Sequence, residues 1–276
     1  MQITYRDIES KNEYNNILII NNNAPENILF IGSCRITAFV NYFYNDDFFG
    51  KKYNYVVVLA HVTSKLSKTI NTNEYIKSLI FNSKILVSEY LVSYNYFNTS
   101  RDSEKNIFQI YDKFDLHISL PNYQDILSYT EDIIQFNEPL RNYYKLYMTN
   151  NMSLIEFSNK LKNFRDSEIN RYCTIINKTQ FTDLSLFVLE NYKDIRLAFS
   201  LNHPTNILFI EMYKIILNTF FNRTIPESVI QINKDSFLGG VPGQQKLTYY
   251  DKLCLDYNID ETYLDKEESD IYLSTF

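Results

Sequence analysis

The sequence predicts an α/β fold built on a mostly parallel sheet, with a large helical insertion in its second half. Through about the first 120 residues, short apolar runs alternate with longer amphipathic segments, as in βαβ units. Between about residues 123 and 192, the segments have a helical pattern instead. We find no repeat and no linker rich in Gly, Pro or Ser. A single domain over residues 1–276 is therefore the simplest interpretation.

The predicted strands are short apolar segments bounded by polar turns. The clearest runs from Tyr55 to Ala60 and is apolar and largely β-branched, as in the buried strands of a parallel sheet. The other predicted strands are residues 17–20, 28–31, 85–88, 114–120 and 195–200.

The predicted helices follow the amphipathic pattern and, in one case, a capping signal. Ser153 and Glu156 have the spacing of a capping box at the start of a helix. The predicted helices are residues 37–44, 72–81, 123–136, 139–148, 153–172, 183–191 and 206–221. After them, the acidic stretch from about residue 256 to residue 276 is predicted to be a peripheral or disordered tail.

Composition excludes several classes of protein. A formal charge of −6 and a pI of about 5.2 argue against a general nucleic-acid binder. No apolar run approaches the ~20 residues of a membrane span, and residues 1–10 carry no basic-then-apolar leader. Cys34, Cys173 and Cys254 are far apart and odd in number, so they indicate neither a disulfide framework nor a metal site. We therefore expect a cytoplasmic protein without a metal.

Residue usage indicates an AT-rich genome. The chain has 24 Tyr and 20 Phe but no Trp, and Asn, Ile and Lys recur throughout. A giant virus, a protist or a low-GC bacterium would show this bias, and a viral protein would then work in the host cytoplasm. Because the bias concerns codons, single Asn, Tyr or Lys residues are weak evidence of function.

The first candidate site motif is Gly32-Ser33-Cys34-Arg35, which lies between a predicted strand and a predicted helix. Glycine permits a sharp turn, and the helix N-terminus offers N–H groups and positive potential to a thiolate, an oxyanion or a phosphate. Such a position can also lower the pKa of a cysteine. Arg35 is a candidate phosphate contact. The alternative is that Cys34 is a core residue, as cysteines after buried strands often are.

The second motif is Ser200-Leu201-Asn202-His203-Pro204-Thr205. Histidine has a suitable pKa for a general base at neutral pH, and Ser200 is a weak candidate for the group that orients it. The alternative is a structural role for His203 beside the next helix, with Pro204 in its first turn.

Further polar residues follow predicted strands, where open α/β sheets place their sites. Ser64, Glu89 and Asn95 are candidate substrate contacts, with Ser64 and Asn95 also able to stabilise an oxyanion. His61 is an alternative base at the end of a strand, whereas His117 lies inside a strand and is expected to be structural.

The order of the two motifs resembles that of the SGNH (GDSL-type) hydrolases, which have Gly-Asp-Ser after their first strand and a late Asp-x-x-His. On this pattern, Cys34 falls on the nucleophile and His203 on the base. Ser33 and Ser200 fall where that family has aspartates. The resemblance implies an SGNH-like three-layer domain, whose third block contains an Asn near the position of Asn95.

The two motifs more closely resemble those of the WcbI-type polysaccharide biosynthesis proteins, a related family that binds coenzyme A. Those proteins have a Gly-Asn-Cys-Gln-like motif after the first strand and a His-Pro-Ser-like motif before a late helix. The resemblance implies an acetyl-CoA-dependent acetyltransferase that modifies a nucleotide-sugar or a glycan in surface polysaccharide biosynthesis. Cys34, His203 and Ser200 would form its catalytic site, and Gly32, Ser33 and Arg35 would contact the cofactor.

Two routes and two other functions remain open at this point. Cys34 could carry the acetyl group, or His203 could activate the acceptor directly while Cys34 only lines the site. The same residues would also suit an SGNH-type carbohydrate esterase that uses water as the acceptor. A non-catalytic glycan-binding module that kept the fold is the third possibility.

Overall fold

The computed structural model describes residues 17–59, 73–89, 114–121, 129–200, 203–231 and 246–276. These residues form a mixed α/β structure with one five-stranded sheet, a small two-stranded sheet and ten α-helices. The chain divides into two compact units. The first unit combines residues 1–122 with 209–240, and the second combines residues 123–208 with 241–276.

The first unit contains the five-stranded sheet, whose order is β1-β3-β2-β4-β5. Its strands are β1 (Ile17–Ile20), β2 (Glu26–Gly32), β3 (Tyr53–Leu59), β4 (Ser83–Glu89) and β5 (Leu116–Leu120). β2 is parallel to β3 and to β4, and β4 is parallel to β5, while β1 is antiparallel to β3. The prediction of a mostly parallel sheet is thus confirmed.

The strand order reverses direction at β2. The chain passes from β2 to β3 on one side of it, and the next strand, β4, pairs with β2 on its other side. Ile31 of β2 is the register partner of Ser88 of β4, so the carboxyl ends of both strands lie together. In doubly wound sheets, this topological switch point is where ligands bind.

One face of the sheet packs against α4 (Glu74–Phe81). Asn73 caps this helix by accepting a hydrogen bond from the backbone N–H of Ile76, and Ile76 and Ile80 are buried. The core cluster on this face comprises Ile17, Leu29, Ile31, Val56, Val58, Ile76, Ile80 and Leu86.

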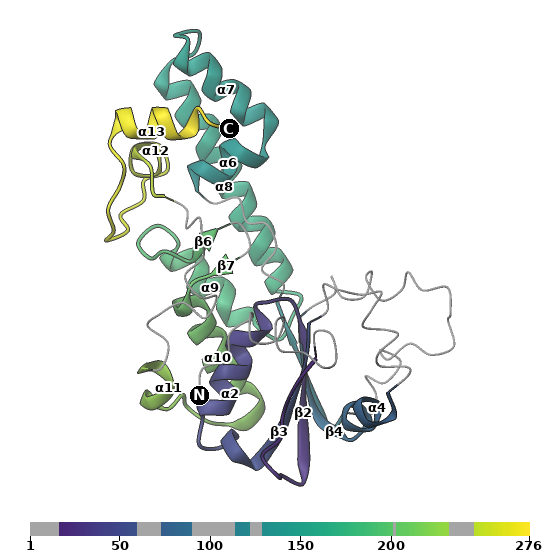
Figure 1. Cartoon of the computed structure of the whole chain (residues 1–276). Helices are drawn as coiled ribbons and strands as arrows, with labels where there is room; N and C mark the ends of the chain where they lie inside the picture. Colours follow the sequence, from purple (N-terminus) through teal and green to yellow (C-terminus); the bar gives the residue numbers. More distant parts are fainter. Residues whose placement is uncertain (1–16, 60–72, 90–113, 122–128, 201–202, 232–245) are drawn as a thin grey trace. The chain divides into compact units, whose positions relative to one another are not determined.

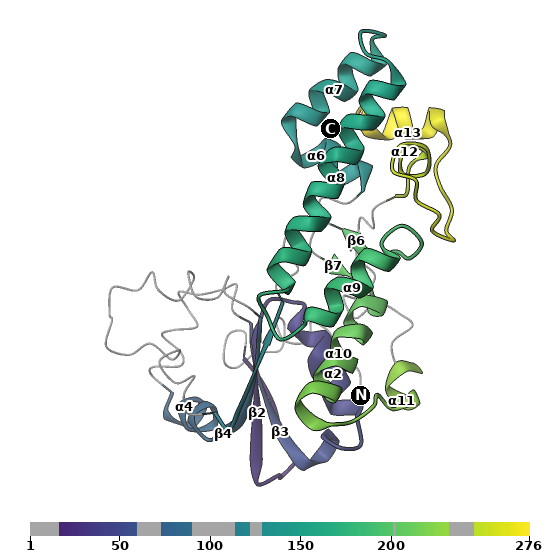
Figure 2. The same cartoon turned by 180° about the vertical axis from the view of Figure 1, so that it is seen from behind.

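The opposite face carries α2 (Ile36–Asn45), and α10 (Asn206–Phe221) packs beside α2 (Figures 1 and 2). Phe30 of β2 meets Phe43 of α2 edge-to-face, with ring centroids 5.4 Å apart. Tyr42 of α2 stacks on Tyr213 of α10 at 5.3 Å. Two shorter helices complete the described part of this unit, the 3₁₀-helix η1 (Gly50–Lys52) and α11 (Glu227–Gln231).

The second unit is mainly helical, as the sequence predicts for the insertion. Its elements are α6 (Thr130–Phe136), α7 (Glu138–Met148), α8 (Leu154–Ile176), α9 (Thr182–Asn191), α12 (Tyr249–Leu253), α13 (Lys266–Leu273), β6 (Ala198–Ser200) and β7 (His203–Pro204). The predicted capping box at the start of α8 is confirmed, because Ser153 and Glu156 each accept the backbone N–H of the other.

The C-terminal segment differs from the peripheral or disordered tail that the sequence predicts. Asp265 and Glu268 form a capping box that starts α13, and Ser269 and Leu273 of that helix are buried. The carboxylate of Asp251 is fully buried and accepts the backbone N–H groups of Thr130 and Thr248.

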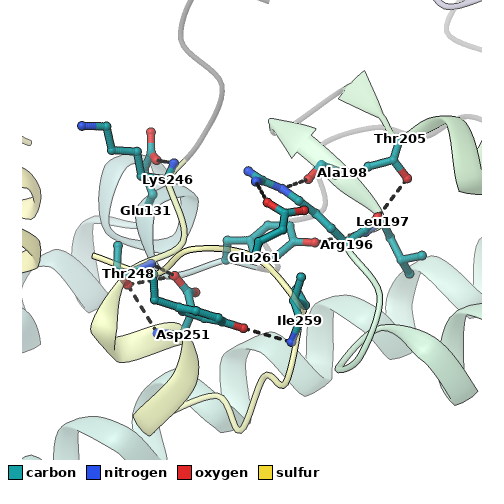
Figure 3. A network of polar contacts seen from close by, with 12 residues as sticks. Glu131, Arg196, Leu197, Ala198, Thr205, Lys246, Thr248, Asp251, Ile259 and Glu261 are labelled. Carbon is teal, nitrogen blue, oxygen red and sulfur yellow. Dashed lines mark hydrogen bonds and ion pairs between the residues drawn. The ribbon is translucent and has the colours of Figure 1, made fainter. Parts of the chain in front are cut away.

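Further polar contacts near Asp251 join the C-terminal segment to the rest of the second unit (Figure 3). Arg196 pairs with Glu261 at 2.6 Å, and the Glu131 carboxylate accepts the backbone N–H of Lys246 at 3.1 Å. The segment from residue 246 onward is therefore part of the packed second unit. Among the helices in the described ranges, none combines the length and the apolar composition that crossing a membrane requires.

Candidate functional site at the carboxyl ends of β2 and β4

The chain turns from β2 directly into helical geometry. The backbone N–H of Ile36 donates to the carbonyl of Ser33 at 3.1 Å, and the N–H of Thr37 donates to that of Cys34 at 3.2 Å. The Thr37 hydroxyl also donates to the Cys34 carbonyl at 2.6 Å. Cys34 therefore lies in the turn that leads into α2, at the switch point of the sheet.

Gly32 is required here by lack of space. Its φ angle lies outside the left-handed region, so the turn itself does not demand glycine. A Cβ atom at this position would lie 2.9 Å from Cδ of Glu89, closer than real Cβ contacts, and 3.0 Å from Cβ of Ile36, which is also tight. The sequence predicts Gly32 for a sharp turn, whereas in the structure the close approach of Glu89 explains the glycine.

The side chain of Glu89, the last residue of β4, reaches across to this turn. Its Oε2 accepts the backbone N–H of Ser33 at 3.1 Å, and its Oε1 accepts the Ser33 hydroxyl at 2.9 Å. Nη2 of Arg35 pairs with Oε2 of Glu89 at 3.2 Å, while Nε of Arg35 donates to Oγ of Ser33 at 3.0 Å. The Arg35 and Glu89 side chains are only 10% and 11% exposed. These three residues form one connected polar network around the half-buried Cys34.

This environment keeps Cys34 in its thiol form. Burial, the largest cause, raises its pKa above the ordinary value of 9.0, and the negative charge of Glu89 raises it further. Arg35 and a hydrogen bond from Ser33 act in the opposite direction but are smaller. The position at a helix N-terminus predicts a lowered pKa for Cys34, whereas burial and the Glu89 charge raise this pKa. Cys34 is therefore predominantly protonated at neutral pH.

The structure describes Ser200 and His203 through their backbones, as paired residues of β6 and β7. The three-residue spacing between them thus becomes a direct cross-strand pairing in a hairpin. Pro204 belongs to β7, and α10 begins at Asn206, so Pro204 does not open the helix as the sequence suggested. His203 belongs to the second unit and Cys34 to the first, and their catalytic pairing stays a prediction.

Of the remaining candidate site residues, some lie within the described ranges and others lie outside them. Ser64, Asn95 and the alternative base His61 lie outside the described residues. His117 forms a cross-strand hydrogen bond at 2.8 Å between its Nε2 and Oγ of Ser88, and burial lowers its pKa. This pairing inside the sheet agrees with the structural role expected for His117. Within the described ranges, no group of three or more His, Cys, Asp or Glu residues is placed to hold a metal ion.

The role of Glu89 is the main feature that sequence reasoning missed. The sequence placed Glu89 among the substrate contacts, because it follows a strand. In the structure it is instead a partner of Ser33 and Arg35, which are 56 and 54 residues away in the chain. The sequence carries no local signal for these bonds, because they depend on the pairing of β2 with β4.

Comparisons with known proteins leave the family open. No protein-family model matches the chain, and no curated protein matches it. One similar solved structure is described as WcbI, a polysaccharide biosynthesis enzyme, in its native form without a disulfide bond between coenzyme A and a cysteine. It is 14% identical, with a TM-score of 0.49, and the match covers 74% of this chain and 71% of that one. A likeness of this size establishes no shared function, and the link to the SGNH hydrolases stays a prediction.

Proposed function

We propose that this chain is an acyltransferase that moves an acetyl group from acetyl-CoA to a hydroxyl or amine of a sugar. The observation that carries the proposal is the position of Cys34. It lies at the carboxyl end of β2, beside the carboxyl end of β4, at the switch point of a parallel sheet. Sheets with this connectivity bind nucleotide-containing ligands at that point, and coenzyme A is such a ligand.

The motif pair of this chain supports the choice of donor. Gly32-Ser33-Cys34-Arg35 and His203-Pro204-Thr205 resemble the motifs of a coenzyme A-binding family of polysaccharide biosynthesis proteins. Acetyl-CoA supplies the acetyl group as a thioester, which is already activated for attack by an oxygen or a nitrogen. The acceptor in the proposal is a nucleotide-sugar or a growing glycan.

The protonated state of Cys34 favours direct transfer over a covalent intermediate. A thiolate is the nucleophilic form of cysteine, and burial and Glu89 disfavour it here. In the proposed mechanism, His203 accepts the proton of the acceptor hydroxyl or amine as that group attacks the thioester carbonyl. The new C–O or C–N bond forms, the C–S bond breaks, and the departing coenzyme A thiolate takes the proton back from the imidazolium of His203. Cys34 lines the site, and Ser200 positions His203 from the neighbouring strand.

The first test is ligand binding to the full chain. Isothermal titration with coenzyme A and acetyl-CoA should give a saturable signal, and a ligand at about 100 times its Kd should stabilise the fold by about 2.7 kcal/mol. A raised melting temperature would report this. Absence of binding at millimolar concentrations, together with hydrolysis of aryl acetates, would replace the proposal with a carbohydrate esterase.

The second test follows labelled acetyl transfer to nucleotide-sugars in variants. His203→Ala should lose transfer by roughly a hundredfold or more, the usual contribution of a general base. His117→Asn, a change at a histidine outside the proposed machinery, should retain it. Cys34→Ala should keep most of its activity, and mass spectrometry should find no acetyl adduct on Cys34. A trapped adduct, with inactivity of Cys34→Ala, would favour the covalent route instead.

A further inference from the structure

The turn after β2 has the features of an anion-binding site. The turn leads into a helix N-terminus, which carries backbone N–H groups and positive potential, and Arg35 adds a full positive charge. The sequence predicts Arg35 as a candidate contact for a cofactor phosphate here. In the structure, however, a carboxylate of the protein takes up this position, because Glu89 accepts the Ser33 N–H and pairs with Arg35.

We propose that Glu89 is the built-in anion of this turn, so that the Gly32–Arg35 segment faces an uncharged part of the ligand. The identity of that ligand rests on the proposed function, in which the uncharged part is the thioester end of acetyl-CoA. The exclusion of phosphate from the turn does not rest on it. Glu89 is in this sense a specificity-determining residue rather than a substrate contact.

Two observations and one electrostatic argument carry the inference. The Arg35–Glu89 pair is nearly buried, so its charges cancel one another where solvent cannot screen them. A second anion placed beside Glu89 would meet like-charge repulsion. Finally, Gly32 has no side chain, which leaves the space that the Glu89 carboxyl group occupies. The turn is thus shaped around its internal carboxylate.

Cys34 reports on the same arrangement, because both charges act on its thiol. Glu89 and Arg35 are the charged groups that act on its thiol within the described residues. Removal of the Glu89 charge should therefore shift the pH profile of Cys34 alkylation to lower pH. A shift of one pKa unit changes the thiolate fraction about tenfold, which is measurable with iodoacetamide and mass spectrometry.

The principal test compares wild type with Glu89→Gln in the presence of inorganic phosphate. Glu89→Gln removes the charge but keeps the shape, so phosphate affinity should rise about tenfold or more. Phosphate should then raise the melting temperature of the variant and slow alkylation of Cys34, and it should do neither in wild type. The matched control is Glu211→Gln, which breaks an ion pair with Lys214 on α10 at 2.5 Å and should leave phosphate without effect.

A double variant checks the charge argument. Arg35→Gln combined with Glu89→Gln removes both charges, so the phosphate affinity gained in the single variant should disappear. Equal phosphate binding by wild type and Glu89→Gln would overturn the inference, and so would an unchanged alkylation profile in Glu89→Gln.

A measurement on wild type keeps the inference testable if Glu89→Gln fails to fold. The uncharged thioester S-acetyl-N-acetylcysteamine should protect Cys34 from alkylation, whereas inorganic phosphate and adenosine 3′,5′-diphosphate should not protect it. Protection by either phosphate compound without protection by the thioester would contradict the inference. If acetyl-CoA does not bind wild type but Glu89→Gln gains phosphate affinity, the proposed function fails and the role of Glu89 stands.

Discussion

Glu89 in the first unit and Asp251 in the second are carboxylates with similar bonds but different surroundings. Each accepts a backbone N–H from a distant segment and a hydroxyl hydrogen, from Ser33 in one case and Thr248 in the other. Glu89 pairs with an arginine and borders a half-buried thiol. Asp251 is completely buried, and burial raises its pKa.

The difference shows that the same side-chain chemistry can stabilise the interior of one unit and lie at a candidate site in the other. Asp251 joins α6 to α12 and is fully buried. Glu89 ends a strand at the switch point of the sheet, where ligands bind in folds of this type. We therefore expect Asp251 variants to change mainly stability and Glu89 variants to change mainly binding.

The largest expected effect is that of Asp251→Ala. The change leaves the backbone N–H groups of Thr130 and Thr248 buried without their acceptor. At 1–3 kcal/mol for each such group, the free energy of unfolding should fall by about 4 kcal/mol. Urea titration followed by tyrosine fluorescence measures this, with Asp260→Ala, at an exposed site of the same unit, as the control. An equal loss of unfolding free energy in Asp251→Ala and Asp260→Ala would contradict the stabilising role assigned to Asp251.

The second effect concerns pH and the buried thiol of Cys254. Burial raises its pKa to about 11 from the ordinary value of 9.0. A raised folded-state pKa gives stability that is present below pH 9 and is lost as the pH rises through about 11. The advantage of wild type over Cys254→Ser in unfolding free energy should shrink across this range by up to ~3 kcal/mol. A difference in unfolding free energy that stays constant with pH would show that the Cys254 thiol does not cause this pH dependence.

Gly32→Ala should have a smaller effect, on both stability and the site. The new Cβ would overlap Cδ of Glu89 and Cβ of Ile36, and overpacking of this kind costs about 2 kcal/mol. Displacement of Glu89 should also change the pH profile of Cys34 alkylation. Gly50→Ala is the matched control, because its Cβ would meet nothing closer than a carbonyl oxygen at 3.5 Å. Similar losses in both variants would show that Glu89 does not depend on Gly32.

The smallest effect is expected for a carboxylate on the surface. Glu74 pairs with Lys77 on α4 at 3.2 Å, but the two side chains are 80% and 42% exposed. Glu74→Gln should change the unfolding free energy by no more than about 0.5 kcal/mol, and less at high salt. A larger loss of unfolding free energy would mean that burial does not explain why Asp251 and Glu89 matter more than exposed carboxylates.

Local signals in the sequence predicted most of the regular elements. The segments 17–20 and 206–221 have the observed bounds of β1 and α10, because apolar periodicity alone determines them. The helix that begins after Ser153 ends four residues later than predicted, since its last turns bury Cys173 and Ile176. That burial depends on neighbours that periodicity does not reveal.

The sequence predicted less of the C-terminal segment and of the site. The capping box at Asp265–Glu268 was present in the sequence, but the acidic composition of residues 256–276 favoured a tail over a helix. The box at Thr248–Asp251 lies before that stretch and starts a short helix that was not predicted from the sequence. The bonds between Glu89 and Ser33 depend on which strands are neighbours and in which register they pair. Strand order joins residues that are far apart in the chain, and a single sequence carries no local signal for it.

The path of the chain between the two units has a consequence for synthesis. The helical unit starts near residue 123, but it closes only through segments after residue 241. Thr130 donates a hydrogen bond to Asp251, 121 residues later in the chain, and Glu131 accepts one from Lys246, 115 residues later. During synthesis on the ribosome, the surface of α6 to α9 that packs against residues 241–276 therefore stays exposed until those residues emerge. We therefore expect the folding of this protein during synthesis to depend more on chaperones that bind exposed apolar helices than the size of either unit suggests.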